Sequence, residues 1–318
     1  MKKAPYHRRE LDNISAYSHL DEGYKLHNQG LQLTGGLLSL RQWELNFGEI
    51  SIRRQHITQG FTAESQFHPQ YTQFLFSAKS SQQDWNFCGQ AIESNCLLAL
   101  PHGMHQFTSS AGFEDFEILI HKPYLAELQA KLHDSIDLVE LEHLLCMPLL
   151  SEQASGFHQE LMHLFVRYQA LPPEQSIHSL RHCAFELVIR ILRTCLNHKP
   201  KQIKLKSRYR LVRNALGFFD QHQGLEGRIS SDDLVDGVYT SPRTLNRAFK
   251  EVFYQAPYQF FLITRLNAAH LALSQHPQMT VADIAFEYGF SSSSEFIQHY
   301  QKFYGVTPHQ QRLNQTSK

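Results

Sequence analysis

Long apolar runs are absent from this chain of 318 residues. No segment approaches the roughly 18 consecutive apolar residues that a membrane-spanning helix needs. The first residues, MKKAPYHRREL, carry charge but lead into no apolar segment of the kind found in a secretory signal peptide. We therefore expect a cytoplasmic protein that has no membrane partner and can reach the chromosome.

Cysteines are few and follow no pattern. The five cysteines are odd in number, scattered and without a CxxC pair; they are Cys88, Cys96, Cys146, Cys183 and Cys195. Disulfide frameworks and zinc sites use paired or clustered cysteines, so we expect reduced thiols in the protein core.

The chain as a whole has no excess of one charge. Lysine and arginine number 30, and aspartate and glutamate also number 30. The balance differs between its two parts, with 17 basic against 21 acidic residues in 1–203 and 13 against 9 in 204–318. An acidic first part and a basic second part fit a sensor joined to a region that faces nucleic acid. Because the excess is small, we expect affinity to depend on where the basic groups stand.

Residues 16–122 have the pattern of short strands. Apolar and polar residues alternate there, as at Phe116, Ile118 and Ile120, and glycine-rich or proline-containing turns separate the alternating stretches. Several short strands separated by such turns predict a small antiparallel barrel or sandwich.

From 123 to 197 the apolar period becomes helical. One stripe begins at Phe157 and a second at Leu180, and Leu171-Pro172-Pro173 interrupts the chain between them, which predicts a helical hairpin. The stripes could pack on the barrel, or part of the second could form a homodimer interface. A stripe alone does not identify its partner, so both interpretations stay open.

Two helix-turn-helix patterns stand in the last third of the chain. The first runs from Ser230 to Phe253 and the second from Thr280 to Pro308. Each has a short amphipathic segment, a tight turn and a helix that begins at serine and has a polar outward face. Two such units joined by a helix predict a device that reads double-stranded DNA.

The first unit carries the basic outward residues. Ser241-Pro242 is a strong helix start, with a capping side chain followed by proline at the first helical position. Leu245, Ala248 and Phe249 should face inward, and the outward residues that we expect to face DNA, together with the cap, are Ser241, Arg243, Thr244, Asn246, Arg247 and Lys250. Arginine suits guanine and asparagine suits adenine by bidentate hydrogen bonding, and Lys250 is better placed for phosphate.

A third helix begins at Pro257 and connects the two units. About 17 residues in this helix would span roughly 26 Å. With the flanking turns, that length could hold two recognition helices about one DNA turn apart on one face of the duplex.

The second unit is less basic. Thr280 should cap its first helix and Gly289 should form its turn, with Phe296 and Tyr300 buried in the next helix. Its outward residues are Ser292, Ser293, Ser294, Glu295 and Gln298, and no lysine or arginine follows until Lys302. We expect this unit to position the protein on DNA more than to read bases.

These residues resemble the AraC/XylS family of bacterial transcription regulators. The resemblance covers roughly 208–312 and rests on SPRTLNRAFKEVF, on RLNAAHLAL, on IAFEYGFSSSSEF and on YGVTPHQQR. It implies that most base contacts come from Arg243, Asn246 and Arg247, and that Ser293, Ser294 and Gln298 occupy the second reading positions. It also implies a nucleoid-associated regulator that works with RNA polymerase.

The chain departs from the family pattern at several positions. The family often has arginine where Gln298 stands and phenylalanine where Tyr300 stands, and Tyr254 replaces the usual glycine after the first recognition helix. The order of sequence features in the N-terminal half is similar to that in family members related to the ethanolamine-operon regulator. That similarity implies control by a small-molecule effector.

The N-terminal half contains one motif with ligand chemistry. Pro101-His102-Gly103-Met104-His105 resembles the second motif of a cupin barrel, shortened by one residue, but the HxH…E cluster of a metal cupin is missing. We expect no metal, no cofactor and no catalytic residue. Aromatic residues could line an apolar ligand pocket, although core packing is the simpler role for each; they are Trp43, Phe74, Phe76, Trp85 and Phe87.

The predicted architecture is α+β. Residues 1–197 form an effector-sensing or dimerisation domain, a cupin-like barrel with a helical hairpin. The lysine-rich segment 198–207 is a linker, and 208–318 is an all-α DNA-binding domain with two helix-turn-helix units joined by a long helix. The predicted function is a sequence-specific transcription activator. The alternatives are a metal-cupin or DNA-repair enzyme fused to the same domain, and an interaction protein that sequesters a regulator.

Overall fold

The structure is a computed structural model of the whole chain. It describes residues 6–11, 17, 25–77, 85–93, 95–132, 136–170, 173–204, 206–222 and 231–316. Ser230 at the start of the first helix-turn-helix pattern and Leu171-Pro172 between the predicted helices lie outside the described residues.

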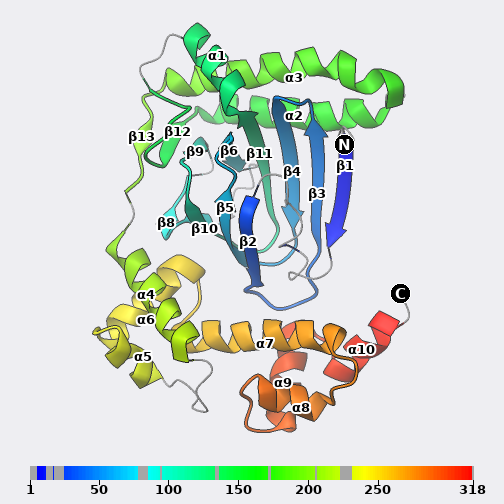
Figure 1. Cartoon of the computed structure of the whole chain (residues 1–318), viewed down its shortest axis with the longest axis vertical. Helices are drawn as coiled ribbons and strands as arrows, with labels where there is room; N and C mark the ends of the chain where they lie inside the picture. The colour runs from blue at the N-terminus through cyan, green and yellow to red at the C-terminus, as the bar shows by residue number, and fades with distance from the viewer. Residues whose placement is uncertain are drawn as a thin grey trace.

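Two antiparallel sheets form the N-terminal domain (Figure 1). The larger contains, in spatial order, β1 (Tyr6–Leu11), β3 (Leu40–Asn46), β4 (Ile50–Ile57), β11 (Phe113–His121), β6 (Tyr71–Ser77), β9 (Cys96–Leu100), β12 (Leu145–Pro148) and β13 (Lys201–Gln202). The smaller contains β2 (Lys25–Gln32), β5 (Phe61–Phe67), β10 (Met104–Ser109), β7 (Trp85–Phe87) and β8 (Gln90–Ala91). In the described residues the strands therefore form a cupin-like pair of sheets rather than one closed barrel.

Alternation along each strand divides the larger sheet into two faces. Phe116, Ile118 and Ile120 of β11 lie in an apolar cluster with the helices, whereas Asp115 and Glu117 face the smaller sheet. This arrangement follows from the period of two along a strand, and it makes one face of the sheet apolar and the other rich in polar groups.

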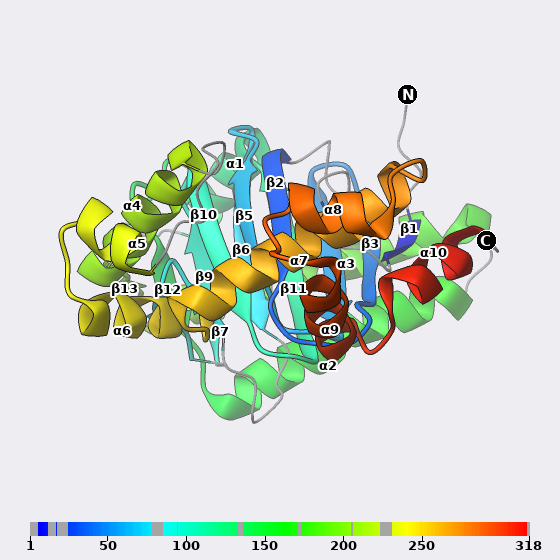
Figure 2. The same cartoon turned by 90° about the horizontal axis from the view of Figure 1, so that it is seen from below.

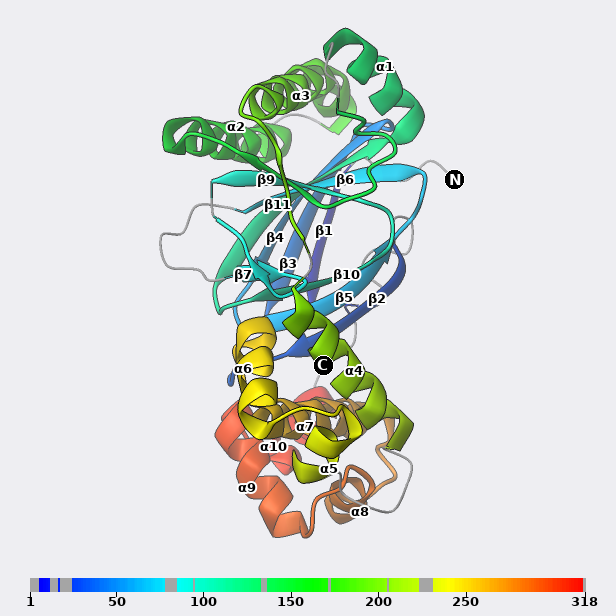
Figure 3. The same cartoon turned by 90° about the vertical axis from the view of Figure 1, so that its left-hand side faces the viewer.

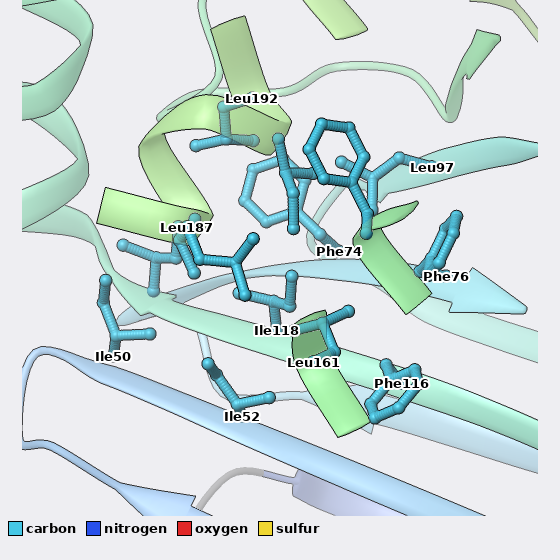
Figure 4. Packing of buried hydrophobic residues seen from close by; sticks show 14 of the residues in the cluster. Ile50, Ile52, Phe74, Phe76, Leu97, Phe116, Ile118, Leu161, Leu187 and Leu192 are labelled. Carbon is cyan, nitrogen blue, oxygen red and sulfur yellow. The ribbon is translucent and has the colours of Figure 1, made fainter. Parts of the chain in front are cut away.

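Three helices cover the apolar face. They are α1 (Lys122–Leu132), α2 (Ser151–Ala170) and α3 (Pro173–Leu196), and α2 and α3 form the predicted hairpin. Leu161 of α2 and Leu187 and Leu192 of α3 pack against strand residues such as Phe74 and Ile118 (Figure 4). Both predicted stripes are therefore buried on the sheet within the chain. Phe74 and Phe76 of β6 lie in the same cluster, so their role is core packing.

The C-terminal domain is all-α, as predicted, and lies on the opposite side of the sheets from α1–α3 (Figures 1 and 3). Its helices are α4 (Ser207–His222), α5 (Ser231–Gly237), α6 (Pro242–Phe253), α7 (Pro257–Gln275), α8 (Val281–Glu287), α9 (Ser293–Tyr304) and α10 (Pro308–Thr316).

Helix α7 joins two separate cores. Phe260 and Phe261 at its start pack with α4, α5 and α6, in a cluster that also includes Trp85 and Phe87 of the smaller sheet. Further along, Leu266 and Leu273 pack with α8 and α9. Figure 2 shows α7 crossing beneath the sheets between the two groups of helices.

The two domains also share polar contacts. Asn86 of β7 donates through Nδ2 to the carbonyl oxygen of Val252 at 2.8 Å, and the amide of Gly36 donates to the carbonyl oxygen of Phe303 at 2.7 Å. Within the segment expected to be a linker, Lys201–Gln202 pairs with β12. The first helix-turn-helix unit is thus held by the sheet, and the second is held at the end of α9.

Among the described residues, no helix combines the length and apolar character needed to cross a membrane.

Candidate nucleic-acid interface

The turn of the first unit lies between α5 and α6. The sequence predicts that Gly237 allows a sharp exit from α5, but the left-handed residue of this turn is Tyr239, with a φ of 51°. Gly237 also serves close packing, because a Cβ there would lie 2.4 Å from the ring of Phe218. Helix α5 does end at Gly237, and packing against α4 is an additional constraint on this residue.

Helix α6 begins where the sequence predicts. The Ser241 Oγ accepts a hydrogen bond from the amide of Thr244 at 3.2 Å, and Pro242 occupies the first helical turn. The Oγ atoms of Ser241 and Thr244 also lie 2.8 Å apart. Both hydroxyl groups therefore fix the start of the helix, which sets how its first turn projects from the protein.

The outward face of α6 is polar and basic. Leu245, Ala248, Phe249, Val252 and Phe253 are buried beneath it. On the opposite face the exposed side chains are Arg243, Thr244, Asn246, Arg247 and Lys250. The 3.6-residue period of the helix produces this separation and aligns the polar groups along one side.

The cations on α6 are not engaged by carboxylates of the described part of the chain, so they stay available to an external anion. Three nearby basic residues, in contrast, form ion pairs: Lys206 and Arg208 with Glu251, and Arg213 with Glu64. An exposed helix face with free guanidinium groups is suited to phosphates and base edges.

The second unit is built by a capping box. Thr280 accepts from the amide of Asp283 at 3.1 Å, and the Asp283 carboxylate accepts from the amide of Thr280 at 2.9 Å. The hydrogen bonds that the hydroxyl and the amide of Thr280 donate to the carboxylate hold the pKa of Asp283 below its ordinary value. Gly289 then forms the turn with a φ of 76°, as the sequence predicts.

Helix α9 offers fewer groups for contact than its sequence indicates. The Ser292 Oγ caps the helix by accepting from the amide of Glu295 at 3.1 Å. Glu295 is half-buried on the solvent side and accepts from the amide of Ser291 at 2.8 Å. Ser294 and Gln298 are exposed, and Ser293 is half-buried. The exposed cation of the helix is Lys302, in its last turn.

Two contacts that the sequence did not reveal attach α7 to the second unit. Arg265 donates to the carbonyl oxygen of Gly289 at 2.9 Å, which fixes the turn before α9. His270 Nδ1 lies 2.6 Å from the hydroxyl oxygen of Tyr300. Tyrosine at 300, where the resemblance leads one to expect phenylalanine, therefore has a buried polar partner, and its burial raises its pKa.

Comparison with known proteins agrees with this geometry. A protein-family profile described as a helix-turn-helix domain matches residues 234–314. This C-terminal domain is of the AraC type. The matched residues include α6 of the first helix-turn-helix unit, the connecting helix α7 and both helices of the second unit.

Among curated proteins, the AraC-type domain is similar to those of two regulators from Pseudomonas aeruginosa. HTH-type transcriptional regulator ArgR is 35% identical over 88 residues, which is 28% of this chain and 26% of that protein. HTH-type transcriptional regulator GbdR is 32% identical over 91 residues, 29% of this chain and 24% of that protein. The match thus spans about a quarter of each relative and lies within one domain.

Solved structures are similar over different extents. The AraC-type regulator from Chromobacterium violaceum is 28% identical, with 33% of this chain and 92% of that chain covered and a TM-score of 0.31. ToxT from Vibrio cholerae is 10% identical, with 99% of this chain and 100% of that chain covered and a TM-score of 0.32.

The N-terminal domain holds a second candidate site, in the space between its sheets. Glu117 and Lys25 line this space, and Arg53 of β4 lies beside them, with Nη1 3.4 Å from Glu117 and Nη2 3.7 Å from Glu44. Lys25 Nζ lies 3.9 Å from Glu117, and all four side chains are almost fully buried. Buried ion pairs contribute little net stability, so stability alone does not account for this polar interior. Its remaining volume is about 30 Å³, enough for one water molecule.

The histidines of the cupin-like motif do not form a metal centre with their neighbours. His105 Nε2 lies 2.6 Å from the carbonyl oxygen of Pro101, and burial lowers the pKa of His105. Within the described residues, no group of three or more histidine, cysteine, aspartate or glutamate side chains could hold a metal ion.

Proposed function

We propose that this chain is a sequence-specific regulator of transcription, acting as an activator in the bacterial cytoplasm. The observation that carries the proposal is the outward face of α6, where Arg243, Asn246 and Arg247 project without carboxylate partners in the described chain. An AraC-type domain surrounds this face and supports the assignment.

In this proposal α6 enters the major groove of double-stranded DNA. Arg243 and Arg247 donate in pairs to guanine O6 and N7, and Asn246 pairs with the N6 and N7 atoms of adenine. Lys250 and the capping hydroxyls of Ser241 and Thr244 contact the phosphate backbone. Helix α9 contributes Ser292, Ser293, Ser294 and Gln298 at the neighbouring groove, and α7 sets the distance between the two helices.

The N-terminal domain supplies control. A small polar effector that exchanges partners with the Arg53, Glu44 and Glu117 network would alter the packing between the sheets. The smaller sheet shares an apolar core with α4, α5 and α6, so a shift of that sheet reaches the reading helix through packed side chains. We further propose that the chain forms a homodimer and contacts RNA polymerase when it activates transcription. No catalytic step is assigned to the chain.

Selection of binding sites from a random duplex pool by the full chain tests the function. The proposal predicts enrichment of one asymmetric motif, with the stronger base preference at the positions facing α6. Recovery of a pool with no preferred sequence, at a salt concentration where binding is measurable, would overturn it.

A further inference from the structure

A second cavity lies outside the paired sheets, between the smaller sheet and the C-terminal domain. Its volume is about 270 Å³. Ala63 and Ser65 of β5 face the space between the sheets, whereas Thr62 and Glu64 face this cleft, because side chains alternate along a strand. The cleft is therefore separate from the site between the sheets. Helices α4 and α7 form its other wall.

Charged groups from both domains line the cleft. Glu64 of the smaller sheet forms an ion pair with Arg213 of α4. Asp220 of the same helix is the second carboxylate in the lining. Burial and the negative charge of Glu64 raise the pKa of Asp220, while Arg213 opposes that change. One guanidinium thus faces two carboxylates, so the lining favours a positively charged guest over an anion.

The floor of the cleft contains a buried acceptor. Gln106 of β10 is 5% exposed, and its Nε2 donates to Thr62 Oγ1 at 3.3 Å. Its Oε1 accepts no hydrogen bond from any described residue. An acceptor that lacks a donor leaves a partial negative charge at the floor of the cleft, which favours a cation there.

The remaining wall is apolar and aromatic. The rings of Phe219 and Phe261 stack with centroids 4.2 Å apart, and Phe260 lies beside them. Gly217 of α4 lines the same space, and a Cβ built there meets no atom within 4 Å. The helix therefore leaves room where a larger side chain would fill the cleft. Aromatic faces attract organic cations and also cover their apolar parts.

We propose that this cleft binds a protonated organic amine with a small apolar body. The ammonium group donates to Asp220 and Glu64, and the body lies against Phe219 and Phe261. A cavity of about 150 Å³ accommodates benzene, so the space here accepts an arylalkylamine. Because Glu64 belongs to one domain and Asp220 to the other, the bound amine stabilises their contact. Any effect of the bound amine on DNA affinity rests on the proposed function of the chain as a DNA-binding regulator.

Calorimetric titration of the full chain at neutral pH tests the site without DNA. The probes are phenethylamine and hexylamine, with phenylacetate and hexanoate as acids of similar shape. We expect saturable binding of the amines alone and a loss of affinity of at least tenfold in Asp220→Asn. Asp236→Asn, an exposed carboxylate on α5, is the matched control and should bind as the parent does.

A second pair of variants tests the space. Gly217→Leu should abolish amine binding by filling the cleft, whereas Gly156→Leu in α2, where a Cβ also meets nothing within 4 Å, should leave it unchanged. Gly217→Ala should fold at least as well as the parent, since alanine favours a helix interior. Equal binding of amines and acids, or full amine binding by Asp220→Asn or Gly217→Leu, would overturn the proposal. These outcomes do not depend on whether a DNA motif is recovered.

Discussion

Asn267 of α7 and Gln32 of β2 hydrogen-bond to each other in both directions across the boundary between the domains. Asn267 Nδ2 donates to the carbonyl oxygen of Gln32 at 3.1 Å, and the amide of Gln32 donates to Asn267 Oδ1 at 3.3 Å. The side-chain amide thus satisfies both backbone groups at the end of the strand, as a neighbouring strand would. The helix that connects the two helix-turn-helix units is thereby tied to the N-terminal domain.

The substitution Asn267→Asp should loosen this connection. A carboxylate cannot donate to the Gln32 carbonyl oxygen, so two acceptors face each other in a buried position. We expect a loss of about 1–3 kcal/mol in unfolding free energy, measured by urea denaturation. The control Asn197→Asp, at an exposed position, should change stability by much less. Equal effects of the two substitutions would show that the hydrogen bonds between Asn267 and Gln32 do not stabilise the protein.

Tyr254 ends α6 in a left-handed conformation, with a φ of 59° and its amide donating to the Lys250 carbonyl oxygen. Because a Cβ is strained there, Tyr254→Gly should be more stable than Tyr254→Ala by about 1 kcal/mol. Tyr258 in the first turn of α7 provides the comparison. At this ordinary helical position the alanine variant should be more stable than the glycine variant. The account fails on this point if alanine is the more stable residue at 254.

Local patterns were readable from the sequence because they depend on neighbouring residues. The cap at Ser241, the capping box of Thr280 and the buried face of α6 all follow from spacing along one helix. The contact between Gln32 and Asn267 joins residues 235 positions apart, and no period in the sequence encodes it.

Other features could not be predicted from the sequence, because they depend on contacts between separate elements of the fold. Gly237 is constrained by the ring of Phe218 from another helix, and Tyr300 has a buried polar partner in His270 of α7. The polar interior between the sheets arises only when β4, β3 and β11 bring Arg53, Glu44 and Glu117 together.

Lys250→Ala should weaken binding to specific and scrambled duplexes equally. Lysine at this position contacts phosphate in the proposed complex and so carries no sequence information. Titrations across a range of salt concentrations should show a slope of log affinity against log salt that is smaller by about 1. Lys131→Ala, in the exposed last turn of α1, should leave the slope unchanged. A selective loss on the specific duplex would assign Lys250 a base contact instead.

The double substitution Ser294→Ala and Gln298→Ala should reduce specific affinity by less than about thirtyfold, since two neutral hydrogen bonds of about 1 kcal/mol or less each contribute at most about 2 kcal/mol. Both side chains are exposed, so folding should be preserved, which circular dichroism can verify. A loss as large as that caused by removing the arginines of α6 would show that the two units read DNA equally.

The reading role of α6 is tested most directly by the double substitution Arg243→Ala and Arg247→Ala in the full chain. Mobility-shift titrations would compare a selected duplex with a scrambled one, and Lys131→Ala with Arg193→Ala would remove the same charge from exposed positions on other helices. Loss of two bidentate contacts should lower affinity for the selected duplex by roughly a hundredfold or more, to the level of the scrambled one, while the control keeps its preference. An undiminished preference for the selected duplex in the α6 variant would contradict the account.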